Sequence, residues 1–303
     1  MGYIGLIAGS SGDSLTDALH NKGYKVALVA GKEEEPGVDK ADKKIIIDLS
    51  NFVEIEEFFR DNKVEFIILG TGHSKAFKLA SYLEKLGFYT SVDIQKSEVA
   101  KDKIRFKKEL DKIKVMTPQY MSFNSDYNLE DIVNNVGIPC VVKSPVDLIQ
   151  PQKVNSKIEL EEAIKELLEL KGEVLIERFI SGVDCTVPVL SDGENVKSLG
   201  VTYYNKAIEY QLKGFEKIYH PKLSEELEKA IEQLSVNIIK KLGFKGLVRL
   251  DYIIENQKIY VLELNSVIMT GYNCTSYPFF KEKGIDIAQE MIDNAMKIYQ
   301  KRL

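Results

Sequence analysis

The 303-residue sequence predicts an α/β unit with a parallel sheet, followed by an α+β unit whose strands are mainly antiparallel. Three observations lead to this prediction. Short apolar runs alternate with amphipathic segments from Tyr3 to Thr90, the pattern changes after Pro118, and two apolar runs joined at 255–257 are typical of an antiparallel hairpin. A chain of this length builds more than one core, so we expect two or three compact units.

The first part of the chain repeats strand and helix, the order that is typical of parallel sheets covered by helices. The expected strands are YIGLIAG, YKVALVA, KIIIDL and VEFIILG, and the expected helices are 14–22, 52–62 and 75–86. Ligands of such sheets bind where strands end, so Ser11 and His73 are predicted substrate contacts. For His73 we favour the alternative that it begins a helix with a satisfied hydrogen bond.

The segment 97–113 is predicted to be one helix, with Ser97 as its N-cap and with Lys107 among the lysines of its later turns. Pro118 then starts a new unit. Its expected strands are MTPQYMSF, PCVVKSP, VLIERFI and CTVPVLSDG, and its expected helices are 128–135 and 158–170.

Two further helices follow from capping signals. Ser224 caps a helix that runs to Leu242 and is followed by Gly243, with acidic residues in its first turn and lysines in its last. Asp286 with Gln289 resembles a capping box at the start of the final helix. Between these helices lies the hairpin of GLVRLDYII and KIYVLELN.

The composition restricts the classes of partner and location. Apolar residues make up 44% and charged residues 29%, and no apolar run approaches the roughly 18 residues of a membrane helix. The net charge of −5 argues against nucleic acid as the main partner. Cys140, Cys185 and Cys274 are too scattered for a zinc site or a disulfide framework, which favours a reducing cytoplasm.

The hairpin carries charges among apolar residues. Arg249 and Asp251 point to one face of the first strand, and Glu263 and Asn265 share a face of the second, because side chains alternate along a strand. Buried carboxylates need a partner, a metal or a proton, and two carboxylates with an amide oxygen suit Mg²⁺ bridging to nucleotide phosphates. The alternative is the solvent-facing side of an edge hairpin, and these residues alone do not decide between the two.

Two features upstream also suggest chemistry. Lys143 ends an apolar strand, where an ammonium group either faces an anion such as phosphate or extends to solvent. Glu177 and Asp184 flank a turn between two apolar strands, where they could bind a planar ligand and its sugar hydroxyls.

An ordered series of residues resembles the ATP-grasp superfamily: Lys103, Lys143, Glu177, Asp184, Arg249, Asp251, Glu263 and Asn265. Within it, IERFISGVDCTVPVL and the distance from Glu263 to Gly284 are most similar to D-alanyl-D-alanine ligase. The resemblance implies a Rossmann-like pre-ATP-grasp domain at 1–95, a connecting helix at 96–115, a small ATP-grasp subdomain at 116–190 and a large subdomain with the metal site at 191–303.

The resemblance also implies site roles. Lys103 and Lys143 would hold the phosphates of ATP, and Glu177, Ile180, Leu262 and Asp184 would bind its adenosine. The implied metal ligands for Mg²⁺ (or Mn²⁺) are Asp251, Glu263 and Asn265, and the implied catalytic residue is Arg249, which would stabilise the phosphoryl-transfer and tetrahedral states.

The chain departs from that family in two loops. The loop after Lys143 reads PVDLIQPQKV and has no glycine, whereas the family's lid is rich in glycine and serine. After Asn265 the family's Pro-Gly is absent, and Cys274 and Thr275 fall where the acceptor carboxylate is held, which predicts a different acceptor. Val267 stands where bicarbonate-using relatives carry an arginine, which argues against bicarbonate as a substrate.

We therefore predict an ATP-dependent carboxylate–amine ligase that forms an amide through an acyl phosphate and releases ADP and phosphate. Its expected partners are a small carboxylate and a small amine, with a homodimer possible and neither nucleic acid nor membrane involved. One alternative is an ATP-grasp kinase or acyl-phosphate-forming enzyme whose acceptor is not an amine. The other is a nucleotide-binding module without turnover, although binding alone would not demand Arg249.

Overall fold

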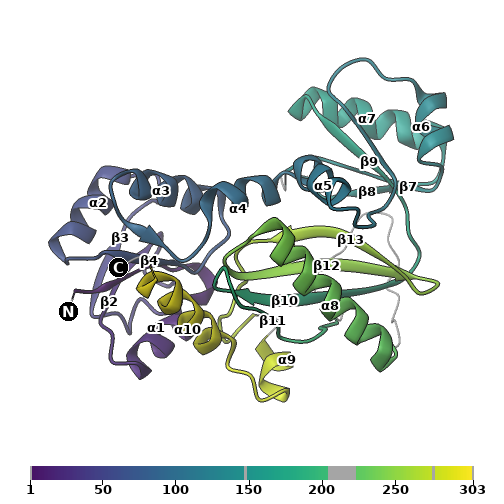
Figure 1. Cartoon of the computed structure of the whole chain (residues 1–303). Coiled ribbons are helices and arrows are strands. Elements are labelled where there is room, and N and C mark those ends of the chain that lie inside the picture. Colours follow the sequence, from purple (N-terminus) through teal and green to yellow (C-terminus); the bar gives the residue numbers. More distant parts are fainter. Residues whose placement is uncertain (1, 147–148, 204–222, 275–276, 302–303) are drawn as a thin grey trace.

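The computed structural model contains three sheets, the first at the left of Figure 1 and the other two at its right. It describes residues 2–146, 149–203, 223–274 and 277–301. The first sheet has five strands and is parallel, and each of the other two has four strands. The prediction of an α/β unit followed by antiparallel units is confirmed.

The first sheet has the strand order β3-β2-β1-β4-β5. Its strands are β1 (Ile4–Ile7), β2 (Val26–Ala30), β3 (Lys43–Ile46), β4 (Phe66–Leu69) and β5 (Tyr89–Thr90). A short 3-10 helix (Gly9–Ser11) leads into α1 (Gly12–Asn21), and α2 (Phe52–Asp61) and α3 (Ser74–Lys85) complete the unit. Apolar residues of α1 pack on one face of the sheet, and those of α2 and α3 pack on the other.

The second sheet, of order β6-β9-β7-β8, is antiparallel. It consists of β6 (Tyr120–Phe123), β7 (Cys140–Lys143), β8 (Gln152–Val154) and β9 (Val174–Arg178). The helices α6 (Leu129–Asn135) and α7 (Lys157–Lys171) pack on one face through buried apolar residues. On β9 that face holds Val174 and Ile176, so Glu177 points to the opposite face, which these helices leave uncovered.

The third sheet has the order β11-β10-β12-β13. Its strands are β10 (Val183–Ser191), β11 (Val196–Ser198), β12 (Gly246–Glu255) and β13 (Lys258–Asn265), and α8 (Glu225–Leu242) packs on its apolar face. Strand β10 pairs with β12 along its whole length, although the sequence placed it within the small subdomain 116–190. We therefore propose that the border between the subdomains lies near Gly182 instead of residue 190.

The predicted helix 97–113 is wrong as a single element. The chain forms α4 (Ile94–Lys101) and α5 (Lys103–Lys112), and it changes direction at Asp102. The Asp102 carboxylate accepts a hydrogen bond from the Arg105 backbone N–H and so begins a new helix, while the N-cap of α4 is Asp93 and not Ser97. Lys103 consequently lies in the first turn of α5.

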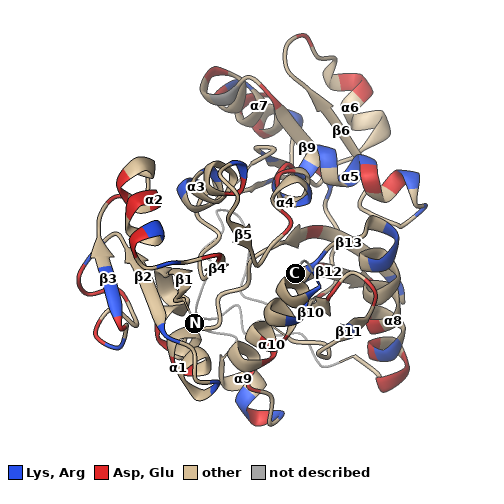
Figure 2. Cartoon of the chain, turned by 60° about the vertical axis from the view of Figure 1, so that its left-hand side comes forward, with Lys and Arg blue, Asp and Glu red and all other residues tan. Residues whose placement is uncertain are grey.

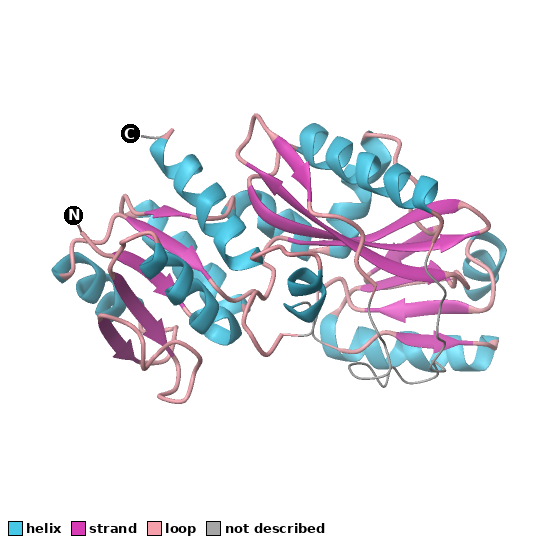
Figure 3. Ribbon diagram, turned by 90° about the horizontal axis from the view of Figure 1, so that it is seen from below, coloured by secondary structure: helices cyan, strands magenta, loops and turns pink. Residues whose placement is uncertain are grey.

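The end of the chain returns to the first sheet. Figure 3 shows the last helix, α10 (Ile287–Gln300), beside the parallel sheet, and its apolar residues share a core with α1 and with the start of β12. The short helix α9 (Tyr277–Glu282) precedes it. The predicted caps Ser224 and Asp286 are confirmed, since both side chains accept hydrogen bonds from the first turns of their helices. No helix in the described ranges could span a bilayer.

Candidate active site

The hairpin of β12 and β13 places its four polar residues on one face. Arg249 lies directly opposite Asn265, and Asp251 lies directly opposite Glu263. The pairing shifts by one residue after Asp251, so Leu262 is an extra residue on β13. This bulge lets Val261 face the core opposite Tyr252 while Glu263 still faces Asp251.

Asp251 is held at the centre of this face. Arg249 donates two hydrogen bonds to its carboxylate, from Nε to Oδ1 and from Nη2 to Oδ2, each at 2.7 Å. The amide nitrogen of Asn265 donates to Oδ2 at 3.1 Å. Burial, together with the neighbouring charge of Glu263, raises the pKa of Asp251 to about 7 despite Arg249.

Glu263 is more exposed and is ionised. Its Oε2 lies 3.3 Å from Nζ of Lys103, which is almost fully buried. Burial opposes ionisation, but Lys103, Lys143 and Arg249 together lower the pKa of Glu263 to about 2. The Lys103 backbone N–H donates to the carbonyl of Pro145, so the loop after Lys143 touches the start of α5.

The small sheet contributes a second group of charges. Lys143 on β7 contacts Glu177 Oε2 at 2.6 Å, and Lys107 on α5 contacts Glu177 Oε1, also at 2.6 Å. All three side chains are at least nine-tenths buried. Because Lys143 also lowers the pKa of Glu263, the two groups of charges lie near enough to interact, and the region between them is called the cleft.

Sequence reasoning missed Lys107. It treated this lysine as one of several cations near a helix C-terminus, but the break at Asp102 turns its side chain inward, where it is fully buried. A signal was available, because Lys107 follows Lys103 by four residues and such residues share one face of a helix.

Asp184 and Ile180 frame the adenosine side of the predicted site. Asp184 pairs with Ile253 on β12, and strand alternation therefore places it on the same face as Asp251. Ile180 is buried and lies between β9 and β10, where the chain crosses from the small sheet to the large one. Thus residues of both sheets predicted to bind adenosine lie around this crossing.

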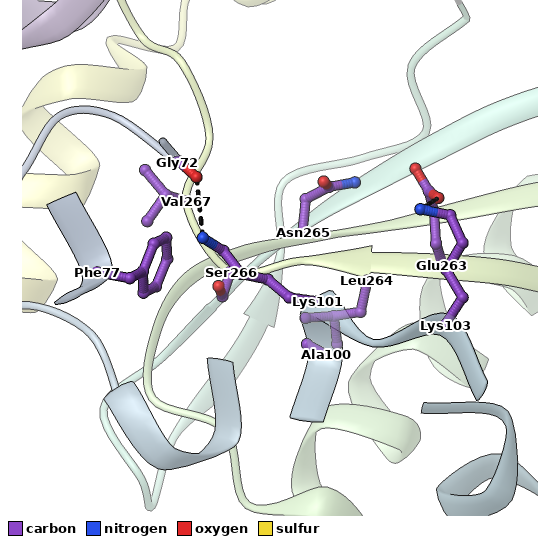
Figure 4. Close-up of a pocket in the computed structure, with 10 residues that line it drawn as sticks. All are labelled: Gly72, Phe77, Ala100, Lys101, Lys103, Glu263, Leu264, Asn265, Ser266 and Val267. Atoms are coloured by element: carbon purple, nitrogen blue, oxygen red, sulfur yellow. Dashed lines mark hydrogen bonds and ion pairs between the residues drawn. The ribbon is translucent and has the colours of Figure 1, made fainter. Parts of the chain in front are cut away.

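A pocket adjoins the predicted metal ligands Glu263 and Asn265 (Figure 4). It is lined by Gly72, Phe77, Ala100, Lys101, Lys103, Glu263, Leu264, Asn265, Ser266 and Val267. Lys101 donates to the Gly72 carbonyl at 3.0 Å, and its Nζ lies 3.4 Å from the centre of the Phe77 ring. The pocket therefore lies between the first unit and the end of β13.

The structure places three of the four predicted substrate contacts. Ser11 is fully buried and its hydroxyl accepts a hydrogen bond from the Thr270 backbone N–H at 2.9 Å, so it fixes the loop after Asn265 and is not available to a substrate. His73 caps α3 by accepting from the Lys75 N–H, as the favoured alternative predicts. Cys274 is half-buried beside the Ser10 carbonyl, and Thr275 lies outside the described residues.

The predicted metal ligands carry the oxygen atoms that a hard cation would need. In the described ranges no three His, Cys, Asp or Glu side chains gather into a metal site. The face of the hairpin instead offers two opposed carboxylates and one amide. Burial and the neighbouring Glu263 raise the pKa of Asp251, and a bound cation would stabilise its ionised form.

Comparisons with known proteins agree with this geometry. The sequence model of a protein family described as D-ala D-ala ligase C-terminus matches residues 109–296. The chain is 30% identical over 283 residues to a D-alanine–D-alanine ligase of Carboxydothermus hydrogenoformans, and the match covers 88% of this chain and 84% of that protein.

The chain belongs to the D-alanine–D-alanine ligase family. The prediction of an ATP-grasp, ADP-forming carboxylate–amine ligase is therefore confirmed.

Solved structures of low identity share the fold of this D-alanine–D-alanine ligase family member. A D-alanine–D-alanine ligase from Bacillus anthracis, solved with ATP, has a TM-score of 0.74 at 21% identity and covers 99% of both chains. N5-carboxyaminoimidazole ribonucleotide synthetase from Thermotoga maritima has a TM-score of 0.76 at 19% identity and covers 98% of this chain and 76% of that one. The predicted fold, an ATP-grasp fold preceded by a Rossmann-like sheet, is confirmed.

Proposed function

We propose that the cleft binds ATP with Mg²⁺, transfers the γ-phosphoryl group to a small carboxylate, and lets a small amine displace the phosphate to form an amide. The observation that carries this proposal is the convergence of the Arg249–Asp251–Glu263–Asn265 face with Lys103 and Lys143 at one cleft. A carboxylate has a poor leaving group, and its conversion to an acyl phosphate supplies a good one. The protein then contributes position and charge.

The metal side of the cleft supplies the charge balance for phosphoryl transfer. Asp251, Glu263 and the Asn265 amide oxygen would hold Mg²⁺ or Mn²⁺, which neutralises the charge of the β- and γ-phosphates when bound. The Asn265 amide nitrogen already donates to Asp251, so its oxygen is the atom left for a ligand role. Arg249 is fixed by two hydrogen bonds and can stabilise charge that develops on the transferred group.

The nucleotide side uses the small sheet and the crossing at Ile180. Lys143 and Lys103 would hold the phosphates as compact cations. Glu177 would accept a hydrogen bond from the adenine amino group, and Asp184 would accept hydrogen bonds from the ribose hydroxyls. Leu262 would pack near the base, since the bulge takes it out of the regular alternation of β13.

The carboxylate donor would enter the pocket beside Glu263, Asn265 and Lys101, and the amine would enter beside the loop after Asn265. This loop is fixed to the first unit by Ser11 and by Tyr272, whose hydroxyl donates to Asp17 at 2.8 Å. Because the residues after Asn265 differ from the family pattern, we propose an acceptor other than D-alanine. A cytoplasmic location and a homodimer are further parts of the proposal.

A substrate panel tests the proposed function. Pairs of small carboxylates and amines, D-alanine with itself included, are scored first by phosphate release and then by the mass of the product. We expect amine-dependent release and an amide product. A phosphorylated product that persists without an amine would instead identify a kinase, and tight ATP binding without ADP formation across the panel would identify a binding module.

A further inference from the structure

Helix α5 connects both sides of the nucleotide cleft through two lysines. Lys103 and Lys107 are four residues apart and so lie on one face of the helix. The first reaches Glu263 on β13, and the second reaches Glu177 on β9. Figure 2 shows α5 between β9 and β13, with several of its residues basic.

Glu177 is shared by two lysines and is buried with both of them. Its two carboxylate oxygens each contact one ammonium group at 2.6 Å. The Lys107 side chain is 0% exposed and also donates to the Thr117 hydroxyl, whereas the Lys143 side chain is 9% exposed. This set of three ionic groups carries one positive charge in excess, and the lysine at its exposed edge is Lys143.

The excess charge changes what Lys143 can do. A buried carboxylate that loses its counter-ion is strongly destabilised. If Lys143 were the sole partner of Glu177, an arriving phosphate would have to compete with that carboxylate for the lysine. With Lys107 in place, Glu177 keeps one ammonium when Lys143 turns to a phosphate, and its Oε2 becomes available to another donor.

We propose that Lys107 is a positioning residue of the nucleotide site: it is the permanent counter-ion of Glu177, and it releases Lys143 for the phosphates of ATP. This role rests on the proposed function in that the cleft must bind ATP. It does not depend on which acid or amine is used.

The electrostatics of the cluster agree with this role. Burial alone would raise the pKa of Glu177, but Lys107 and Lys143 hold it below its usual value, so the carboxylate is ionised between them. Burial lowers the pKa of Lys107, and the contact with Glu177 opposes that effect.

Calorimetric titration with ATP, in the absence of any acid or amine, tests the proposal. We expect Lys107→Met to raise the ATP Kd at least about tenfold, because Glu177 then retains Lys143. Lys108→Met, at the next and exposed position of α5, is the matched control and should leave the Kd within about twofold. Thermal unfolding of each variant is recorded in parallel.

The double variant Lys107→Met/Glu177→Gln decides whether Lys107 acts through Glu177. A neutral amide does not retain Lys143, so the double variant should bind ATP within about threefold of Glu177→Gln alone. If the losses of the two single variants multiply instead, or if Lys107→Met binds ATP as Lys108→Met does, the proposal is wrong.

If Lys107→Met does not fold, the comparison of the double variant with Glu177→Gln still tests the role of Lys107. The double variant removes both charges of the Lys107–Glu177 pair and therefore leaves neither of them without a partner. Wild-type ATP binding without amide formation in the substrate panel would overturn the proposed function and leave the role of Lys107 intact.

Discussion

The two sides of the cleft differ in the balance of their charged side chains and in the exposure of those side chains. On the small sheet, Glu177 has a lysine at each oxygen, and the whole cluster is nearly closed to solvent. On the large sheet, Arg249 and Lys103 face Asp251 and Glu263 in equal number, and the Glu263 side chain is 29% exposed. In the proposed function, the first side supplies a cation for the phosphates and the second supplies carboxylates for a metal. We therefore expect changes on the small sheet to alter nucleotide affinity and changes on the large sheet to alter turnover.

The largest expected effect is on turnover. Arg249→Met should lower kcat by about 10²–10³-fold, because the guanidinium stabilises charge in the transition state, while the ATP Kd should stay within about threefold of wild type. Steady-state ADP release and calorimetry measure the two quantities. Arg105→Met, at an exposed position of α5, is the control. A loss confined to ATP affinity would contradict the division between the two sides.

The small sheet should show the opposite result. Lys143→Met removes the ammonium group nearest the exposed edge of the Glu177 cluster and should raise the ATP Kd about 10- to 100-fold, as expected for a charged hydrogen bond. At saturating ATP, kcat should fall by less than about fivefold. If kcat fell by orders of magnitude and the Kd did not change, Lys143 would belong functionally to the turnover side.

The pH dependence of metal binding sharpens the account of Asp251. Its pKa of about 7 lies above the usual value for an aspartate, so the carboxylate takes up a proton as the pH falls through 7. A metal binds the ionised form, and the apparent Mg²⁺ affinity in the presence of ADP should therefore drop about tenfold between pH 8 and pH 6. Asp251→Asn should bind Mg²⁺ more weakly, and its Mg²⁺ affinity should change less between pH 8 and pH 6. The change that remains in this variant measures the contribution of the titration of ADP itself. Equal pH dependence in both proteins would refute the assignment.

A smaller effect is expected in the pocket beside β13. Lys101→Met should raise the KM for the carboxylate donor about three- to tenfold without changing the ATP Kd, because Lys101 lines this pocket together with Phe77. The exposed Lys78 gives the control Lys78→Met. An unchanged KM for the carboxylate would show that the carboxylate does not contact the Lys101 side of the pocket.

The smallest effect concerns the loop after Asn265. Ser11→Ala removes the hydrogen bond from the Thr270 N–H and should lower the free energy of unfolding by about 1 kcal/mol, with a modest rise in the KM for the amine. Ser10→Ala is the control. Ser10 is exposed and contacts Cys274 of this loop through its backbone carbonyl, which the substitution keeps. An unfolding free energy equal to that of the control would rule out Ser11 as an anchor.

The sequence predicted the large-sheet side of the cleft better than the small-sheet side. Period-two alternation places Arg249 with Asp251 and Glu263 with Asn265, and one register then brings the two pairs together. The bulge at Leu262 could not be predicted, because it depends on the pairing of two strands and on the core contact of Val261. The helix break at Asp102 was missed because an aspartate can lie inside a helix as well as begin one.

The helix break at Asp102 explains why Lys107 was missed. The contacts of its partner Glu177 were also predicted only in part. Glu177 was predicted to bind the adenine amino group, and its two lysine partners were not predicted, because they come from separate elements that meet only in the folded chain. Ser11 was misplaced for a similar reason. Its strand end does lie at the edge of the sheet, but the loop after Asn265 covers it.

The central claim is that ATP activates a carboxylate as an acyl phosphate before the amine attacks. Transfer of ¹⁸O tests it most directly: an acid found in the substrate panel is labelled in its carboxylate, and the released phosphate is analysed by mass spectrometry. The account predicts one ¹⁸O atom in each phosphate formed together with an amide, with ADP as the other product. Unlabelled phosphate accompanying the amide would contradict it.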